Sequence, residues 1–179
     1  PAEDRHTRAT TALRVASWAR ARSDAGAMLT AARMLADAGV RETDGRSAAT
    51  ALADEAVAMM PSDPAIRHQA DAIRDAAPRG IIRGPLGDGP IVIRHALLAG
   101  ATARWPVQAR GGTTTIVSAV GDGDADIDMH VTRGRSTVCT DIDRDPNPVC
   151  RWRTASNATF QVALTNRGRL TTRVVLLSN

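Results

Sequence analysis

Residues 121–150 read GDGDADIDMHVTRGRSTVCTDIDRDPNPVC, and this stretch decides how the second half of the chain folds. Gly134-Arg135 is a glycine-led two-residue turn of the kind that joins antiparallel strands. With that turn as the pivot, one set of facing pairs is largely apolar: Ile127 with Ile142, Met129 with Thr140, and Val131 with Val138. Residues one position out of phase form a second, acidic set: Asp126 with Asp143, Asp128 with Asp141, and His130 with Cys139. Because alternate residues of a strand point to opposite faces, the pattern predicts a hairpin with one apolar and one acidic face.

The acidic face needs positive charge. Carboxylates directly opposite one another destabilise a sheet unless something neutralises them. Calcium binds about six to eight oxygen ligands, and alternating Asp side chains with loop carbonyls are a common source of them. The candidate calcium ligands are all seven acidic residues that follow Asp88: Asp122, Asp124, Asp126, Asp128, Asp141, Asp143 and Asp145. Ion pairs with Arg144, Arg151 and Arg153 are the alternative, as are carboxylates that are simply solvated.

Two cysteines, Cys139 and Cys150, flank the acidic, proline-containing residues 143–148. A disulfide between them would staple this loop and would require an oxidising compartment. The alternative is a pair of buried free thiols. A zinc site would need further thiol or imidazole ligands nearby, so the disulfide is the better prediction.

Composition and charge exclude several classes of function. All 23 basic residues are Arg, the formal net charge is +4, and only Trp18, Trp105, Trp152 and Phe160 are aromatic. Nucleic-acid binding favours a clustered basic stripe, whereas these arginines are scattered. There is no apolar run of about 18 residues, so no membrane span is expected. The sequence begins at Pro1 rather than at Met, which is expected either of a trimmed form of the chain or of a processed mature form that has lost an export signal.

The first half of the chain has helical periodicity. Ala-rich segments with apolar residues at helical spacing predict helices over 9–22, 25–38, 47–60 and 64–76. Residues 51–73 resemble a tetratricopeptide-type junction between two helices, which makes a helical hairpin array an alternative to an ordinary bundle. Glycine and proline then cluster over residues 79–90 and predict a linker.

After the linker, short β-type runs recur with turn residues between them. They predict strands over 91–98, 102–109, 113–120, 126–132, 137–142, 149–154, 159–165 and 169–177. The expected fold is therefore α+β in two parts: an α-helical bundle of helical hairpins over 1–78 and a jelly-roll-like antiparallel β-sandwich over 91–179.

The β half resembles the bacterial pre-peptidase C-terminal domain over residues 90–177. The residues that carry the resemblance are Leu97-x-x-Gly100, Trp105-Pro106-Val107, the Gly-Asp-Gly-Asp-x-Asp-x-Asp segment over 121–128, Trp152, and Phe160-x-Val162 followed by Asn166-x-Gly168. His130 stands where the family usually has an aromatic residue. The resemblance implies a secreted, non-catalytic module that assists secretion or binds polymers, and some related modules bind calcium.

Catalytic motifs are sparse. The four histidines are isolated, with neither an HExxH pattern nor a Gly-x-Ser-x-Gly elbow. We therefore expect a periplasmic or extracellular accessory module that is not an enzyme and that binds a protein or a cell-envelope polymer, with Ca²⁺ as a stabilising ion. Two alternatives stay open: a small hydrolase that uses the Asp cluster, and a helical scaffold that recruits a secreted peptidase.

Overall fold

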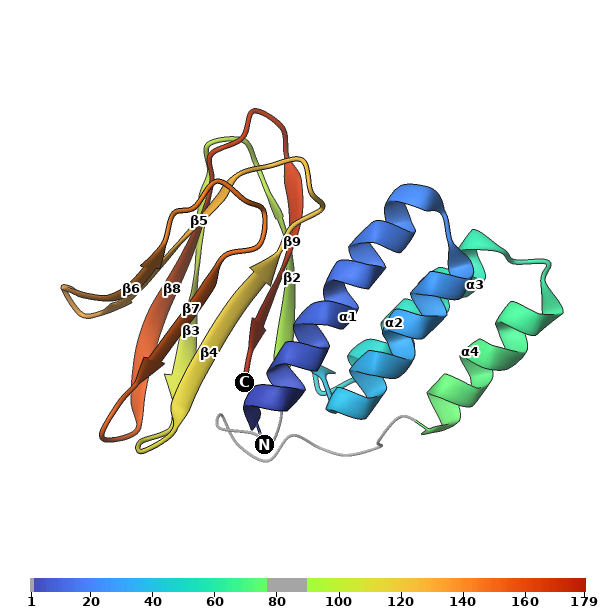
Figure 1. Ribbon diagram of the computed structural model, residues 1–179, viewed down its shortest axis with the longest axis horizontal. Coiled ribbons are helices and arrows are strands. Elements are labelled where there is room, and N and C mark those ends of the chain that lie inside the picture. Colours follow the sequence, from blue (N-terminus) through green and yellow to red (C-terminus); the bar gives the residue numbers. More distant parts are fainter. Residues whose placement is uncertain (1, 77–89) are drawn as a thin grey trace. The chain divides into compact units, whose positions relative to one another are not determined.

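The computed structural model describes residues 2–76 and 90–179, and these residues divide into two compact units (Figure 1). Of the described residues, the first unit holds 2–76 and 90–92, and the second holds 93–179. Helices come first in the chain and two antiparallel sheets follow, so the predicted α+β class with a β-sandwich is confirmed. The linker expected over 79–90 lies outside the described residues, except for Pro90.

The first unit is built from helices α1 Ala2–Arg22, α2 Ala25–Ala38, α3 Ala48–Met59 and α4 Pro64–Ala76. The last three agree closely with the predicted ranges. Helix α1 begins at Ala2 rather than at residue 9, because its first turn carries acidic Glu3 and Asp4, which interact favourably with a helix N-terminus. Within the described ranges, none of these helices is both long and apolar enough to cross a membrane.

Residues that cap helix ends set the boundaries of α2 and α4. Asp24 precedes α2 and accepts a hydrogen bond from the N–H of Ala27 at 2.9 Å. Gly39 ends α2 with a φ of 67°, a left-handed conformation that glycine adopts at little cost. Asp63 precedes α4 and accepts from the N–H of Ala65 at 2.8 Å. These contacts satisfy backbone groups that a helix end otherwise leaves unpaired.

Alanine fills most of the helical core, and few large side chains join it. Met28, Leu29, Leu35 and Leu52 are its largest fully buried members. Two ion pairs tie α3 to its neighbours: Arg20 of α1 holds Glu55 with contacts of 2.5 and 2.8 Å, and Arg74 of α4 contacts Asp54 at 2.6 Å.

A short strand that the sequence analysis did not predict, β1 Arg41–Glu42, completes the first unit. Arg41 pairs with Ile91 and Glu42 with Val92 in parallel, and the N–H of Arg41 donates to the carbonyl of Pro90 at 3.0 Å. A strand of two residues has no periodicity for a sequence pattern to reveal.

The second unit is a β-sandwich, built from four strands of a five-stranded sheet and from a separate four-stranded sheet. Its strands are β2 Ile91–Leu97, β3 Thr102–Ala109, β4 Thr114–Val120, β5 Ile127–Arg133, β6 Ser136–Asp141, β7 Val149–Arg153, β8 Ala158–Asn166 and β9 Thr172–Ser178. One sheet has the order β1-β2-β9-β4-β7, in which β1 and the first two residues of β2 belong to the first unit, and the other sheet has the order β3-β8-β5-β6. Apart from the β5–β6 hairpin, consecutive strands alternate between the sheets, which gives a jelly roll.

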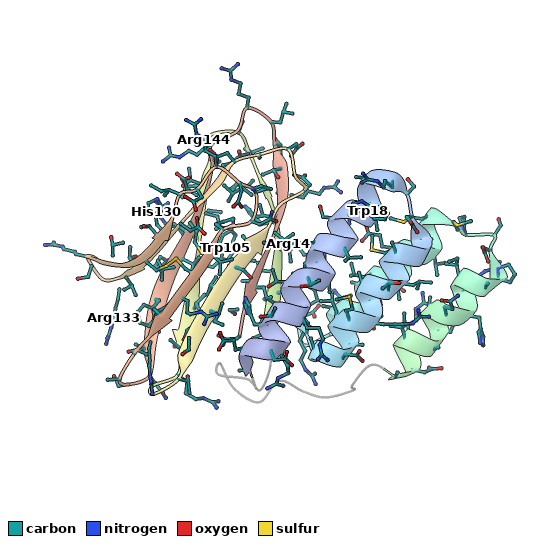
Figure 2. The ribbon with its side chains drawn as sticks, viewed as in Figure 1. Arg14, Trp18, Trp105, His130, Arg133 and Arg144 are labelled. Atoms are coloured by element: carbon teal, nitrogen blue, oxygen red, sulfur yellow. A yellow bond between two sulfur atoms is a disulfide. The ribbon has the colours of Figure 1, made fainter. Side chains whose placement is uncertain are left out.

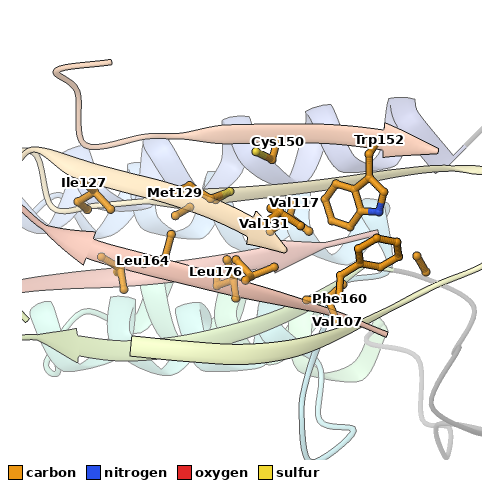
Figure 3. Packing of buried hydrophobic residues seen from close by; sticks show 14 of the residues in the cluster. Val107, Val117, Ile127, Met129, Val131, Cys150, Trp152, Phe160, Leu164 and Leu176 are labelled. Carbon is orange, nitrogen blue, oxygen red and sulfur yellow. The ribbon is translucent and has the colours of Figure 1, made fainter. Parts of the chain in front are cut away.

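The sandwich core lies between the two sheets, and Figure 3 shows its packing. Trp152 and Phe160 supply most of its aromatic bulk, with ring centroids 5.2 Å apart. Aliphatic side chains from both sheets complete the core, among them Val117 and Leu176 of one sheet and Val131, Val162 and Leu164 of the other.

The β5–β6 hairpin has the predicted turn, but its register differs from the prediction. Arg133 faces Ser136 and Thr132 faces Thr137, as a Gly134-Arg135 turn requires. The register then shifts, so that Val131 faces Cys139 rather than Val138. One extra residue in β6 produces this β-bulge, which exchanges the two faces of the strand beyond it.

The bulge reverses which residues of β6 face the core. Val138 and Ile142 were expected on the apolar face, yet they are 38% and 62% exposed. Cys139 packs against the core instead, and Asp141 pairs with Met129 on the same side. The expected opposition of Asp128 and Asp141 is therefore wrong.

The same reversal brings Cys139 of β6 to Cys150 of β7, and the predicted disulfide is present. The two Cα atoms lie 5.8 Å apart, within the usual range for a disulfide. Strands β6 and β7 are edge strands of different sheets, so this bond closes one side of the sandwich.

Candidate functional site

The predicted calcium ligands are distributed over two loops and two strands of the sandwich. Asp122 lies in the loop after β4, where its carboxylate accepts hydrogen bonds from the hydroxyl of Thr172 and from the N–H of Arg173, the latter at 2.9 Å. Asp122 thereby anchors the start of β9 to the β4–β5 loop.

Asp124 shares a hydrogen bond with Asp122. That bond raises the pKa of Asp124 above its ordinary value, and burial and the charge of Asp122 act in the same direction. Burial opposes the charged form of Asp122. Hydrogen bonds from Asp124, from the N–H of Arg173 and from Thr172 outweigh it and lower the pKa of Asp122. The two carboxyls therefore form an acid pair in which Asp124 holds the proton more firmly.

Asp128 is neutralised by an arginine that the sequence analysis did not propose. Its side chain is 8% exposed and contacts the guanidinium of Arg167 at 2.6 Å. The backbone N–H of Arg167 donates to the carbonyl of Asp126 at 2.8 Å, which holds the arginine beside β5. The Asp126 side chain is half-buried, and its Oδ1 has no hydrogen-bond partner among the described residues.

Of the remaining three aspartates, Asp141 and Asp145 stabilise the loop between β6 and β7 through their carboxylates, and Asp143 takes part through its backbone. Asp141 accepts from the N–H of Val149 at 2.8 Å and from the N–H of Asp143 at 3.3 Å. Asp145 accepts from the N–H of Asn147, and its carbonyl accepts from the N–H of Ile127 at 3.1 Å. These carboxylates satisfy loop backbone groups, as short Asp side chains commonly do.

The seven aspartates thus do not converge on a single point. In the parts of the chain that the structure describes, no group of three His, Cys, Asp or Glu side chains is placed to hold a metal ion together. Of the three arginines considered as partners, Arg153 donates to the carbonyl of Gly112 at 2.7 Å. Calcium binding by these loops stays a prediction.

A second surface, which the sequence analysis did not single out, is the outer face of the sheet β3-β8-β5-β6. We call it the open face, and it comprises Thr102, Arg104, Pro106 and Gln108 of β3, Thr159, Gln161, Ala163 and Thr165 of β8, Asp128, His130 and Thr132 of β5, and Thr140 of β6. All of them except Asp128 are exposed or half-buried. The outer face of the other sheet differs, because Ile116 and Val120 of β4 and Val175 and Leu177 of β9 are buried there.

The open face is ordered by bonds between neighbouring strands. The hydroxyls of Thr102 and Thr165 lie 2.8 Å apart, and the hydroxyl of Thr159 donates to Oε1 of Gln108 at 3.0 Å. Such cross-strand pairs hold polar side chains in fixed positions. The signal for this surface was present in the sequence, because polar and small residues occupy alternate positions of 102–109 and 158–166.

Comparisons with known proteins add little to this description. No protein-family model matches the chain, and no curated protein is significantly similar to it. A solved structure that resembles it, a de novo designed double-stranded β-helix determined by solution NMR, has 10% sequence identity and a TM-score of 0.32. The alignment covers 49% of this chain and 97% of the designed one. A likeness this weak carries no argument about function.

Proposed function

We propose that this chain is an exported, non-catalytic binding module that holds a cell-envelope polymer on the open face. The observation that carries the proposal is the open face itself. Four adjacent strands present exposed hydroxyl, amide and cationic side chains in register, and a polymer can follow such a surface over several repeats.

The rigidity of the sandwich supports this role. The disulfide between Cys139 and Cys150 ties β6, at the edge of the open face, to the opposite sheet. A surface that is already ordered loses less conformational entropy when it binds. The disulfide also supports export, because disulfides persist in oxidising compartments.

The resemblance to the pre-peptidase C-terminal domain belongs to the same proposal, since that family consists of secreted modules without catalytic residues. Calcium belongs to it as a stabilising ion. We propose that the ion binds at Asp122 and Asp124 of the β4–β5 loop, because the charge of Asp122 contributes to the raised pKa of Asp124 and a cation would relieve this repulsion.

Co-sedimentation of the full chain with insoluble polymers tests the proposal. Suitable probes are purified peptidoglycan, cellulose and chitin, each compared with the variant Ala163→Phe. Ala163 lies on β8, one of the two inner strands of the open face, so a phenyl ring there should obstruct a bound chain. Ala155→Phe adds the same ring at an exposed turn residue and serves as the control.

We expect at least one polymer to sediment the wild type and the Ala155→Phe variant but not the Ala163→Phe variant. Equal sedimentation of all three proteins would place binding away from the open face. If the chain bound none of these insoluble polymers and no soluble polysaccharide either, the proposed function would be excluded.

One observation favours a second candidate, a helical scaffold that recruits a secreted peptidase. Trp18 of α1 is 47% exposed, and the guanidinium of Arg22 lies 4.5 Å from its ring centroid. Exposed Trp and Arg side chains are common anchors of protein interfaces. Capture of a peptidase by the full chain, abolished by Trp18→Ala and retained by Ala163→Phe, would support this candidate over polymer binding.

A further inference from the structure

We propose that the polymer bound on the open face is an acidic polysaccharide, and that Arg104 and His130 together hold its carboxylate groups. This inference rests on the proposed function and specifies the chemistry of the ligand. Its basis is the register of three strands of the open face.

Arg104 and His130 lie in one row across the sheet. Arg104 of β3 pairs with Ala163 of β8, and Ala163 also pairs with His130 of β5. All three point outward, because their neighbours along each strand, such as Trp105, Leu164 and Met129, pack into the core. Neighbouring strands are about 4.8 Å apart, so Arg104 and His130 start about 10 Å from each other. Figure 2 labels His130 on the sandwich.

The residue between them leaves room for a ligand. Ala163 is half-buried, and its side chain is only a methyl group. A shallow depression therefore lies between the two longer side chains of Arg104 and His130. A guanidinium presents a planar fork of donors that matches a carboxylate, and an imidazole on the other side can donate one further hydrogen bond. A carboxylate above Ala163 is therefore within reach of both groups.

Arg104 is exposed and His130 half-buried, and among the described residues neither forms a hydrogen bond or an ion pair. Asp128, the single acid of the open face, already contacts Arg167. The free charge of this surface is therefore positive, which complements an anionic ligand.

The neutral side chains beside the row point to a sugar rather than to a simple polyanion. Gln161 and Thr165 are the next outward-facing residues of β8 on either side of Ala163. Their amide and hydroxyl groups suit the hydroxyls of a sugar ring, whereas phosphate-rich polymers offer only charge. A repeating sugar acid provides both kinds of group at once.

The test measures binding of the full chain to three soluble polymers by affinity electrophoresis. Polygalacturonate supplies sugar carboxylates, dextran supplies neutral sugars, and inorganic polyphosphate supplies charge without sugar. We expect polygalacturonate to bind at least about tenfold more tightly than either of the others, as the loss of one hydrogen bond to a charged group would predict.

Single substitutions test whether Arg104 and His130 bind the carboxylate groups. Arg104→Gln and His130→Gln should each weaken polygalacturonate binding by about tenfold. Arg67→Gln removes the same charge as Arg104→Gln from an exposed position of α4, and it should leave binding unchanged. Because all three side chains are exposed or half-buried, a thermal melt should show that each variant stays folded.

The outcomes separate this inference from the proposed function. Dextran binding as tight as polygalacturonate binding, blocked by Ala163→Phe and unaffected by Arg104→Gln, would overturn the inference and leave the open face as a polymer site. Equal effects of Arg67→Gln and Arg104→Gln, or polyphosphate binding as tight as polygalacturonate binding, would reduce the interaction to unspecific charge attraction and also overturn it. If the chain bound none of the polymers, both this inference and the proposed function would be contradicted.

Discussion

Two side chains, Asp128 and Arg167, show how one contact between distant residues neutralises a buried charge. The Asp128 side chain is 8% exposed, so without a cation it would be a carboxylate largely removed from water. Leaving one member of a largely buried ion pair without its partner is more costly than losing an exposed pair.

We predict that Arg167→Gln lowers the free energy of unfolding by about 1–3 kcal/mol, since Arg167 itself is partly exposed and solvent screens part of the charge. Urea denaturation measures the change. Arg169→Gln, at an exposed position two residues further along, should change stability by less than about 0.5 kcal/mol. Adding Asp128→Asn to Arg167→Gln should restore part of the loss, and no restoration would contradict the pairing.

The acid pair of Asp122 and Asp124 predicts a specific pH dependence. Because the pKa of Asp124 is raised in the folded state, its contribution to stability is present in acid and is lost as the pH rises through the folded pKa. The lowered pKa of Asp122 has the opposite sign: its contribution is present at higher pH and is lost as the pH falls.

Asp124→Asn should therefore be more stable than the wild type at pH 7, where the wild type has two adjacent carboxylates. The amide can still donate a hydrogen bond to Asp122. The difference should vanish at about pH 3, where Asp124, with its raised pKa, carries its proton and is neutral like the amide. Urea unfolding of both proteins from pH 3 to 7 in the presence of EDTA checks this, and a wild type that is more stable at pH 7 would refute it.

Among the elements, the pair β6 and β7 depends most on a covalent bond. Each is an edge strand with one hydrogen-bonded neighbour, β5 or β4, and the disulfide joins them across the sandwich. The bulge in β6 makes that bond possible because it turns Cys139 toward the core. A bulge and a bond between sheets also protect an exposed edge from pairing with other chains.

We predict that replacing Cys139 and Cys150 together by Ser lowers the free energy of unfolding by about 2–3 kcal/mol, the chain-entropy value for a loop of this length. The sandwich should persist, because β5 and β4 still pair with these strands. Denaturant unfolding measures the loss. A reducing agent should destabilise the wild type by a similar amount and leave the double variant unchanged. If it destabilised both proteins equally, its effect would not come from the disulfide, and the prediction would be contradicted.

The β4–β5 loop carries the calcium prediction. If an ion binds at Asp122 and Asp124 and is present at about 100 times its dissociation constant, it should add about 2.7 kcal/mol, which corresponds to a rise of several degrees in the melting temperature. Thermal melts in EDTA and in millimolar Ca²⁺ measure this rise. Asp122→Asn combined with Asp124→Asn should abolish it. An identical melting temperature in both buffers would contradict calcium binding, and Asp122 and Asp124 would then be only a hydrogen-bonded acid pair.

Over the whole molecule, the net positive charge lies in one half because acidic residues are fewer there. Residues 1–89 hold 12 Arg and 12 acidic residues, whereas residues 90–179 hold 11 Arg and 7 Asp. The formal net charge of +4 therefore belongs entirely to the half that contains the sandwich. Attraction to a polyanion should then depend on salt in a way that folding does not.

We predict that raising NaCl from 0.1 to 1 M weakens polygalacturonate binding by at least about tenfold, since the screening length falls from about 10 to 3 Å. The melting temperature should change little, because apolar burial dominates the stability of both cores. Binding that is insensitive to salt would contradict a charge-based site and would favour contacts with neutral sugars alone.

The sequence by itself determined the elements and the class of this protein. Helical periodicity located α2, α3 and α4, and alternation with regular turns located eight strands, because these signals depend on residues close together in the chain. The Gly134-Arg135 turn and the cysteine pair were also visible, since both are local patterns with few structural solutions.

Only the tertiary structure decided which side chains meet. A single bulge at Val138 reversed one face of β6, and no local pattern announces a bulge. Arg167, rather than Arg144, Arg151 or Arg153, neutralises Asp128, because the order of strands places the end of β8 beside β5. The row of Arg104, Ala163 and His130 likewise needs the register of three strands drawn from residues 102–166. Such contacts depend on strand order and register, which involve residues far apart in the chain.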